Sequence, residues 1–420
     1  MSKIVRYLFP IAFLFITFSF SFIAYDPAEL TIIGPEFHDQ HYFEEELNII
    51  SNKLNVKIKY KGVTDPESYL INNPDHNVSL AVIPNPQGVT NLADRGLISN
   101  LNSLRIDENL IQDIYSDHLV DLVSLSGDTY AGWLRLFPNS LIWYDISKIS
   151  QYENINFQSF DSLVSETKKI ADDGVTPWCS NSESSSSTGW IQTNWLEDVI
   201  LSKYGPDIYD RWMNMDIQVS NVKIFSSLKV IGELLFYPNH TYGGSKSAYN
   251  YEFRNLPKIM LNPNNECFMS WSGHYFRYYI PDNYIYGEDY GVAKLPYINI
   301  ENTVVGIGDS IVLVNNNEVS MKVISQILSK DFGQTWSSYR DSEYISANKR
   351  FEISNINNDL TKYEFEILHD ALIHDLFRYD ASEIMPRDFG SNSLWKFFND
   401  YMQQGPSSVI KLLNELDKEI

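Results

Sequence analysis

Apolar and polar residues follow two different periods in the first part of the chain. Residues Ala28–Phe37 form a short apolar run that ends at a Gly-Pro turn, which predicts a buried strand. In His41–Asn55 the apolar side chains recur every three or four positions, as on one face of a helix. An alternating segment, VKIKYKG, and a second apolar run, Val78–Gly88, predict further strands, and a short helix ends near Gly96. This succession predicts an α/β layer with a parallel sheet.

The middle of the chain has a helical pattern. Helices are predicted at Ser159–Gly174, Trp195–Gly205 and Asn221–Leu235, so the region from about residue 141 to 289 is mostly helical. Two strand-like segments, YGVAKLP and NTVVGIGDSIVLVN, and a helix follow, and the last stretch, Thr361–Ile420, is again helical. The sequence GIGDS, Gly306–Ser310, lacks the lysine and the third glycine of a phosphate loop, which favours a tight turn.

A chain of 420 residues is too long for one ordinary core and suits two domains. The order of segments indicates that the chain crosses between two lobes more than once. We expect residues 25–137 and 290–333 to form an N-terminal α/β lobe. We expect residues 138–289 and 334–420 to form a mostly helical C-terminal lobe.

The first residues are typical of a secretory signal peptide, which we assign to residues 1–24. Lys3 and Arg6 precede an apolar run, Leu8–Phe18, and small and polar residues follow in Ser19–Ala24. Cleavage after residue 21 and cleavage after residue 24 both fit, and an uncleaved anchor is the alternative. No later stretch is long and apolar enough to span a membrane, so we expect a soluble, periplasmic mature chain.

The composition narrows the class of partner. A formal net charge of −22 repels phosphate backbones, which excludes nucleic acid as an expected partner. Aromatic residues reach 14%, which is a hint of a binding surface with apolar faces and polar edges. The cysteines, Cys179 and Cys267, are an even pair in an exported chain, which favours a disulfide over two buried free thiols.

Sequence motifs of common catalytic sites are absent from the chain. It has no His-Glu-x-x-His, Gly-x-Ser-x-Gly or phosphate-loop motif, and its histidines and cysteines lack metal-ligand spacing, so we expect neither a metal nor a cofactor. A glycosidase needs only two facing carboxylates, and several lie beside aromatic or glycine-rich segments. These candidates are Glu36, Glu197, Asp198, Asp309 and Asp380.

Several motifs resemble the extracellular solute-binding proteins of ABC importers, the maltose-binding-protein-like group. LAVIPNPQGVTNLADRGLISNLN resembles their second strand and cleft segment, and YAGWLRLFPNSLIWYD resembles their first crossing between lobes. The α-glucoside-binding branch is the most similar, through Trp178-Cys179, Thr188-Gly189-Trp190 and the run Thr193–Asp198. The tail FRYDASEIMPRDFGSNSLWKFFNDY also resembles that branch, and the likeness covers nearly the whole mature chain.

Three departures from the α-glucoside-binding pattern lie near the expected pocket. Ser270 and Ser272 flank Trp271 where the branch usually has His and Gln, and Ile307 interrupts its glycine run. Arg387 stands where glycine is commoner. These differences bear on the identity of the ligand more than on the fold.

The resemblance implies a periplasmic-binding-protein-like α/β fold, with two lobes around a ligand cleft joined by a hinge of several crossings. Sugars present C–H faces that pack on aromatic rings and hydroxyls that bond to polar groups. Strand ends, the crossing segments, the Trp190 region and the tail are expected to line the cleft, with Glu197 or Asp198 as a further polar anchor. The candidate ligand-binding residues are Glu36, Phe37, Asn85, Pro86, Trp133, Trp143, Tyr144, Trp190, Trp195, Trp271, Asp309, Asp380 and Arg387.

The resemblance implies a non-catalytic, monomeric binding subunit that delivers a mono- or oligosaccharide, such as an α-glucoside, to ABC permease subunits in the inner membrane. The same transport role with a non-sugar polar metabolite is the main alternative. A secreted glycoside hydrolase that uses two of the acidic residues is the other.

Overall fold

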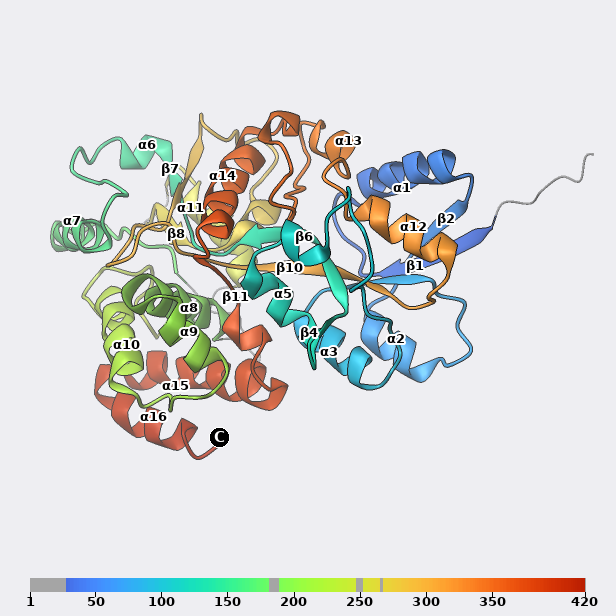
Figure 1. Ribbon diagram of the computed structural model, residues 1–420. Helices are drawn as coiled ribbons and strands as arrows, with labels where there is room; N and C mark the ends of the chain where they lie inside the picture. Colours follow the sequence, from blue (N-terminus) through green and yellow to red (C-terminus); the bar gives the residue numbers. More distant parts are fainter. Residues whose placement is uncertain (1–27, 181–188, 247–251, 265–266, 420) are drawn as a thin grey trace, which may run out of the picture.

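The computed structural model describes residues 28–180, 189–246, 252–264 and 267–419 (Figure 1). The predicted signal peptide and the serine run Ser184–Ser187 lie outside the described residues. The chain forms two lobes side by side, one built on a six-stranded sheet and the other around a three-stranded sheet. We call them the first and second lobes. In the described part of the chain, no helix is long and apolar enough to cross a membrane.

The sheet of the first lobe has the order β11-β10-β3-β1-β2, and β6 pairs with β10. Strands β1, β2 and β3 are parallel, while β10 runs antiparallel to β3 and β6. Helices α1, α12 and α13 cover one face of this sheet, and α2 and α3 cover the other (Figure 1). The bounds are β1 Glu29–Gly34, α1 Gln40–Leu54, β2 Lys57–Gly62, α2 Pro66–Asn72, β3 Leu80–Ile83, α3 Pro86–Asp94, β6 Ala131–Pro138, β10 Val304–Leu313, α12 Glu318–Ile327, α13 Gln334–Ser337 and β11 Phe377–Tyr379.

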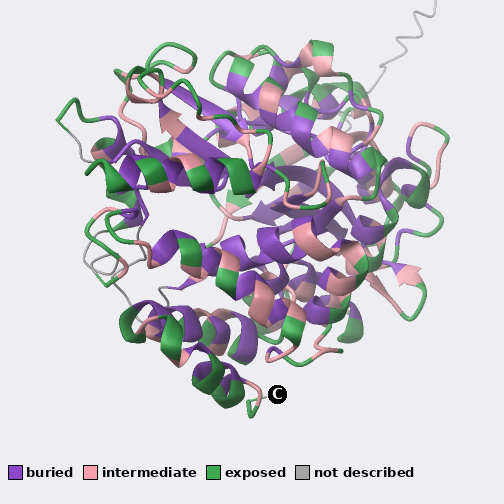
Figure 2. Cartoon of the chain, turned by 90° about the vertical axis from the view of Figure 1, so that its left-hand side faces the viewer, coloured by how far each residue is buried: buried purple, intermediate pink, exposed green. Residues whose placement is uncertain are grey.

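The second lobe packs helices around the antiparallel sheet β8-β7-β9. Buried positions line the inner faces of its helices, and exposed positions lie outward (Figure 2). Its elements are β7 Leu141–Asp145, α6 Ile146–Ile149, α7 Phe160–Asp172, α8 Trp190–Tyr204, α9 Pro206–Met213, α10 Val222–Leu235, η2 Phe253–Asn255, α11 Leu256–Met260, β8 Met269–Trp271, η3 His274–Tyr279, β9 Tyr290–Lys294, η5 Ala381–Glu383, η6 Asp388–Leu394, α15 Trp395–Gln404, η7 Pro406–Ser408 and α16 Val409–Leu416. The remaining elements are α4 Ile111–Ile114, α5 Asp117–Leu122, β4 Ser124–Leu125, β5 Asp128–Thr129, η4 Ile353–Asn355 and α14 Asp359–Ile373.

The structure confirms the strands and helices that periodicity predicts in the first part of the chain, but GIGDS is not a tight turn. Gly306–Ser310 lies inside the long strand β10. Gly306 pairs with Pro138 and Gly308 with Leu136 of β6. A Cβ at Gly306 would lie 2.5 Å from the carbonyl oxygen of Phe137, and one at Gly308 would collide with the carbonyl oxygen of Arg135. The glycines therefore allow a close approach of two strands, not a reversal of the chain.

The lobe boundaries set from the sequence need adjustment at two places. Strand β9 pairs with β7 in the sheet of the second lobe, although the sequence assigned it to the first. Residues after 333 return to the first lobe, where Trp336 donates its backbone N–H to Glu46 at 3.0 Å and Tyr339 stacks on Tyr42. The tail is also not purely helical, because β11 adds a strand to the first sheet. We propose that the later crossings lie after β9 and after β11.

Two crossings between the lobes are hydrogen-bonded to each other at Asn139 and Ser140. The backbone N–H of Asn139 donates to the carbonyl of Val305 at 2.8 Å, and the N–H of Val305 donates to Ser140 Oγ at 2.8 Å. The hydroxyl of Ser140 donates to Asp198 on α8. Asp198 also accepts from Trp271 Nε1 at 2.8 Å, and the ring of Trp271 stacks on Trp195 with centroids 4.9 Å apart. Helix α8 is thereby fastened to the hinge.

The predicted disulfide is confirmed. Cys179 and Cys267 are bonded, with Cα atoms 5.2 Å apart. The bridge is buried, and the backbone N–H of Cys179 donates to the carbonyl of Met269 on β8 at 2.6 Å. It joins the segment before α8 to the segment that enters β8.

Removal of the bridge should destabilise the folded protein. For Cys179→Ala/Cys267→Ala we expect the free energy of unfolding to fall by about 2–5 kcal/mol, because the unfolded chain regains the freedom of a long closed loop. Urea denaturation followed by tryptophan fluorescence measures this loss. Wild-type protein treated with reductant is the matched comparison and should fall by a similar amount. Equal midpoints for the oxidised wild type and the double variant would contradict the prediction.

Burial of Asp198 should make stability depend on pH. Burial raises the pKa of Asp198 to about 7, despite the hydrogen bonds from Ser140 and Trp271. Because folding raises the pKa of this carboxyl, its protonated form stabilises the folded protein in acid. This stabilisation is lost as the pH rises from about 4 through about 7. Relative to that of Asp198→Asn, the free energy of unfolding of the wild type should therefore fall by up to roughly 4 kcal/mol between pH 4 and pH 8.

Urea denaturation of both proteins at pH 4.5, 6 and 8 tests this prediction. Asp282→Asn, at an exposed position, is the control for the loss of one negative charge. If the stability difference between the wild type and Asp198→Asn stays constant across this range, Asp198 does not titrate there and the prediction is wrong.

Candidate functional site

A polar pocket of about 800 Å³ lies between the two lobes. The first lobe contributes the β2–α2 loop, the end of β3 and the start of α3. The second lobe contributes η5, η6 and the first residue of α15. The lining residues are Thr64, Asp65, Pro66, Glu67, Ile83, Pro84, Asn85, Gln87, Asn91, Ser382, Glu383, Arg387, Ser391, Asn392 and Trp395.

Two strand-to-helix turns build the wall from the first lobe. At the start of α2, Asp65 accepts from the backbone N–H of Ser68 at 2.9 Å. At the start of α3, Asn85 accepts from the N–H of Gly88 at 2.7 Å. A proline follows each cap at the first helical position, where the missing N–H costs nothing. The side-chain amide of Asn91 donates to Glu67, which connects the two helices.

The wall from the second lobe is held in place from behind by buried polar groups. Asp380 caps η5, accepting from Ser382 Oγ at 2.7 Å and from the N–H groups of Ser382 and Glu383. The N–H of Ser382 also donates to Glu197 at 3.2 Å, and the N–H of Ala381 donates to Tyr209 Oη at 3.1 Å. Burial raises the pKa of Glu197, and the charge of Asp380 raises it further. These groups fix the backbone that forms this wall.

Charges of both signs face the pocket. Carboxyl groups come from Asp65, Glu67 and Glu383, and a guanidinium comes from Arg387. Hydrogen bonding by the backbone and then the side chain of Ser68 lowers the pKa of Asp65. Burial, and then the charge of Asp380, raises the pKa of Glu383 to about 7. With the amides and hydroxyls around them, these groups offer both donors and acceptors to a small polar molecule.

Asn85 and Arg387 are the predicted site residues that line this pocket. Glu36 lies next to it, because its side chain packs on Gly62 just before the β2–α2 loop. Pro86 is buried as the first residue of α3, and Asp380 lies behind η5 as its cap.

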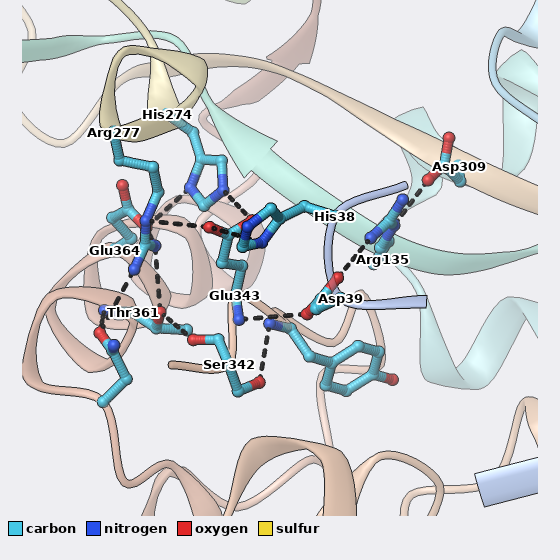
Figure 3. Close-up of polar contacts among 12 residues, drawn as sticks. His38, Asp39, Arg135, His274, Arg277, Asp309, Ser342, Glu343, Thr361 and Glu364 are labelled. Carbon is cyan, nitrogen blue, oxygen red and sulfur yellow. Dashed lines mark hydrogen bonds and ion pairs between the residues drawn. The ribbon is translucent and has the colours of Figure 1, made fainter. Parts of the chain in front are cut away.

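Asp309 belongs to a charged network at another part of the junction between lobes (Figure 3), and Phe37 packs against Arg135 of that network. Asp309 accepts from Arg135 Nε at 2.6 Å, and the Arg135 guanidinium lies 4.1 Å from the ring centre of Phe37. Arg135 also lies 3.6 Å from Asp39. Asp309 is therefore engaged by a cation inside the first lobe. Asp309 lies within strand β10 and not at the tight turn that the sequence predicted.

Figure 3 also shows the part of this network that comes from the second lobe. His274 Nδ1 lies 2.8 Å and Arg277 3.1 Å from Glu364 on α14. Arg277 Nε lies 3.5 Å from Glu343, which donates its backbone N–H to Asp39 of the first lobe. Burial acts to raise the pKa of Glu343, but hydrogen bonding by His274 and the charge of Arg277 lower it to about 2.

The structure places most of the predicted tryptophans in the core instead of on the pocket wall. Trp133, Trp143, Trp195 and Trp271 are each at most 2% exposed. Their indole N–H groups donate to Leu119, Ser272 and Trp271 carbonyls and to Asp198, respectively. A buried indole needs such a partner, and these four have theirs within the protein.

The two remaining aromatic candidates are half-buried but are not among the pocket-lining residues. Trp190 lies edge-on to Phe253 and Tyr275. Tyr144 stacks on Phe157, with ring centres 5.1 Å apart.

Trp395, which the sequence did not indicate as a site residue, is an aromatic residue that lines the pocket. Its indole N–H lies 3.4 Å from Ser382 Oγ, and Gly189 packs directly against its backbone carbonyl. Other missed lining residues are Asp65, Glu67, Gln87 and Glu383. Three of these positions could be found from the sequence. The Asp-Pro and Asn-Pro pairs that follow predicted strands indicate helix starts, and Asp65, Glu67 and Gln87 lie in or directly beside these pairs.

No protein-family model matches the chain. Over 398 residues it is 24% identical to the osmoprotective compounds-binding protein GgtB of Synechocystis sp., covering 94% of this chain and 92% of that protein. Over 392 residues it is 24% identical to the alpha-glucosides-binding periplasmic protein AglE of Rhizobium meliloti, covering 89% and 83%.

Solved structures have the same fold. The bacterial solute receptor AcbH matches with a TM-score of 0.76 at 15% identity, covering 93% of this chain and 98% of that one. RafE from Streptococcus pneumoniae matches with a TM-score of 0.74 at 11% identity, covering 94% and 97%. Maltose-bound MalE3 of T. maritima matches with 0.64 at 13% identity, covering 93% and 98%. The chain thus has the fold of the maltose-binding-protein-like solute-binding proteins, and its sequence is similar over nearly its whole length to the binding proteins GgtB and AglE.

Proposed function

We propose that the protein binds a small saccharide in the pocket between its lobes and delivers it to an ABC permease. The observation that carries this proposal is the pocket itself, whose described lining residues place polar groups from both lobes around one indole, that of Trp395. It lies beyond the carboxyl ends of β2 and β3, where open α/β sheets bind their ligands.

A sugar matches both kinds of surface in this pocket. The C–H face of a pyranose packs on an aromatic ring, here the half-buried indole of Trp395. Sugar hydroxyls donate to carboxylates and accept from guanidinium groups, and such charge-assisted hydrogen bonds are stronger than neutral ones. Glu67 and Asp65 supply acceptors from one lobe, and Arg387 supplies donors from the other.

Binding that draws on both lobes favours their closure. A solute that contacts Asp65 and Arg387 together stabilises the arrangement in which the walls face each other. The closed, loaded form is the one that we propose the permease recognises. The protein then acts as a monomer, performs no chemistry on the solute and works in the periplasm, as the name of the AglE relative says of that protein.

Two names among the relatives support two classes of solute. AglE is named for alpha-glucosides, which matches the first proposal. GgtB is named for osmoprotective compounds, so a small osmoprotective solute is a second candidate for the same pocket. Among the lining residues that the structure describes, Trp395 is the one aromatic side chain, which favours a ligand with one or two rings over a long oligosaccharide.

A thermal-shift screen of the mature protein tests the solute class. The panel contains glucose, maltose, trehalose, sucrose, and non-sugar osmolytes and acids. A ligand at about a hundred times its dissociation constant stabilises the folded state by about 2.7 kcal/mol. A shift with a saccharide supports the first proposal, and a shift with a non-sugar solute alone replaces it with the second. Recovery of every bound oligosaccharide unchanged excludes the hydrolase alternative.

Trp395 should carry much of the affinity for the saccharide that gives the largest shift. Trp395→Ala should weaken binding by about 1–3 kcal/mol, because it removes the stacking face, while Trp395→Phe should retain most of the affinity. Isothermal titration calorimetry measures both.

Trp190→Ala is the matched control for this test. It removes a half-buried indole that lies outside the pocket lining, so the dissociation constant should change little. A loss of affinity in Trp190→Ala, with none in Trp395→Ala, would move the stacking wall to α8.

A further inference from the structure

One side chain connects the two lobes directly at the pocket. Gln87 lies in the first turn of α3 in the first lobe and lines the pocket. Its side-chain amide donates to the backbone carbonyl of Ile384 at 2.5 Å and to that of Met385. Both carbonyls belong to the segment between η5 and η6, in the second lobe.

Both ends of this contact are held firmly by their own lobes. On the donor side, the cap at Asn85 and the proline at position 86 fix the start of α3. On the acceptor side, the N–H groups of Ile384 and Met385 donate to the carbonyl of Ala381 at 3.0 and 2.9 Å. Ala381 is in turn held by Tyr209 of α9. A movement of one lobe away from the other therefore has to break the Gln87 contact.

We infer that Gln87 is a positioning residue that holds the lobes in the closed arrangement, acting as a latch beside the pocket. The inference rests on the proposed function, in which the pocket binds solute by closure. A carboxamide suits this role because its nitrogen carries two N–H donors, and two carbonyl oxygens face it.

Different side chains at position 87 should open the lobes to different extents. Gln87→Ala removes the two hydrogen bonds and leaves the carbonyls to water. Gln87→Glu removes both donors and places a carboxylate against two carbonyl oxygens, in a pocket that already contains Glu67 and Glu383. The glutamate variant should therefore open the lobes more than the alanine variant does.

The first measurement follows the lobes without any solute. Spin labels at Ser68→Cys on α2 and Lys396→Cys on α15, both exposed positions, report the distance between lobes by double electron–electron resonance. We expect the wild type to have a closed component, and the ratio of open to closed molecules to rise about tenfold or more in Gln87→Glu and less in Gln87→Ala. Circular dichroism checks that each variant is folded.

Gln151→Glu is the matched control. The amide of Gln151 donates to the carbonyl of Ser147 at 3.0 Å, a contact that stays within the second lobe. This variant should leave the distance distribution unchanged. The inference is overturned if Gln87→Glu and Gln87→Ala keep the wild-type distribution, or if the wild type has no closed component.

The second measurement separates the latch from the proposed function, with maltose as the probe. Because the apparent dissociation constant is inversely proportional to the closed fraction, it should rise in Gln87→Glu by the factor by which the labels show that fraction to fall. If maltose fails to bind while the labels still report opening, the latch stands and maltose is not the solute. If maltose binds equally to the wild type and Gln87→Glu, the latch does not contribute to binding and the inference fails.

Discussion

The hydroxyl of Ser140 is the point on which the arrangement of the two lobes depends. It accepts from the backbone N–H of Val305 in one crossing and donates to Asp198 on α8. The carbonyl of the same residue accepts from the N–H of Leu295 at 2.9 Å. One residue therefore connects two crossings and a helix in a buried place, where an unmatched polar group would cost about 1–3 kcal/mol.

The same helix carries this constraint to the pocket. Asp198 holds the hinge, and its neighbour Glu197 accepts from the N–H of Ser382 on the pocket wall. The acidic pair of α8 thus contacts both the crossing between the lobes and the back of the pocket wall.

Periodicity predicts the elements of the first lobe because each helix there has one buried face. Helix α8 differs, since every residue from Ile191 to Ser202 is buried. A helix surrounded on all sides gives no stripe, so the sequence could not show which face Trp195 occupies. The disulfide was predictable from the even pair of cysteines. The positions of Asn85 and Arg387 at the pocket were predictable from the strand end and from the tail motif. The pocket role of Trp395 depends on how η6 and α15 meet Gly189, which no local pattern encodes.

The glycine pair in β10 shows how one misassigned segment affects the site. Read as a turn, Gly306–Ser310 would present free N–H groups to a ligand. As a strand, it brings β10 so close to β6 that Asp309 meets Arg135, whose guanidinium covers the ring of Phe37. Phe37 and Asp309, which the sequence predicts to bind solute, both contact Arg135 near the end of β1. The pocket lies instead between the β2–α2 loop, the start of α3 and the tail, which are the segments that face each other across the lobes.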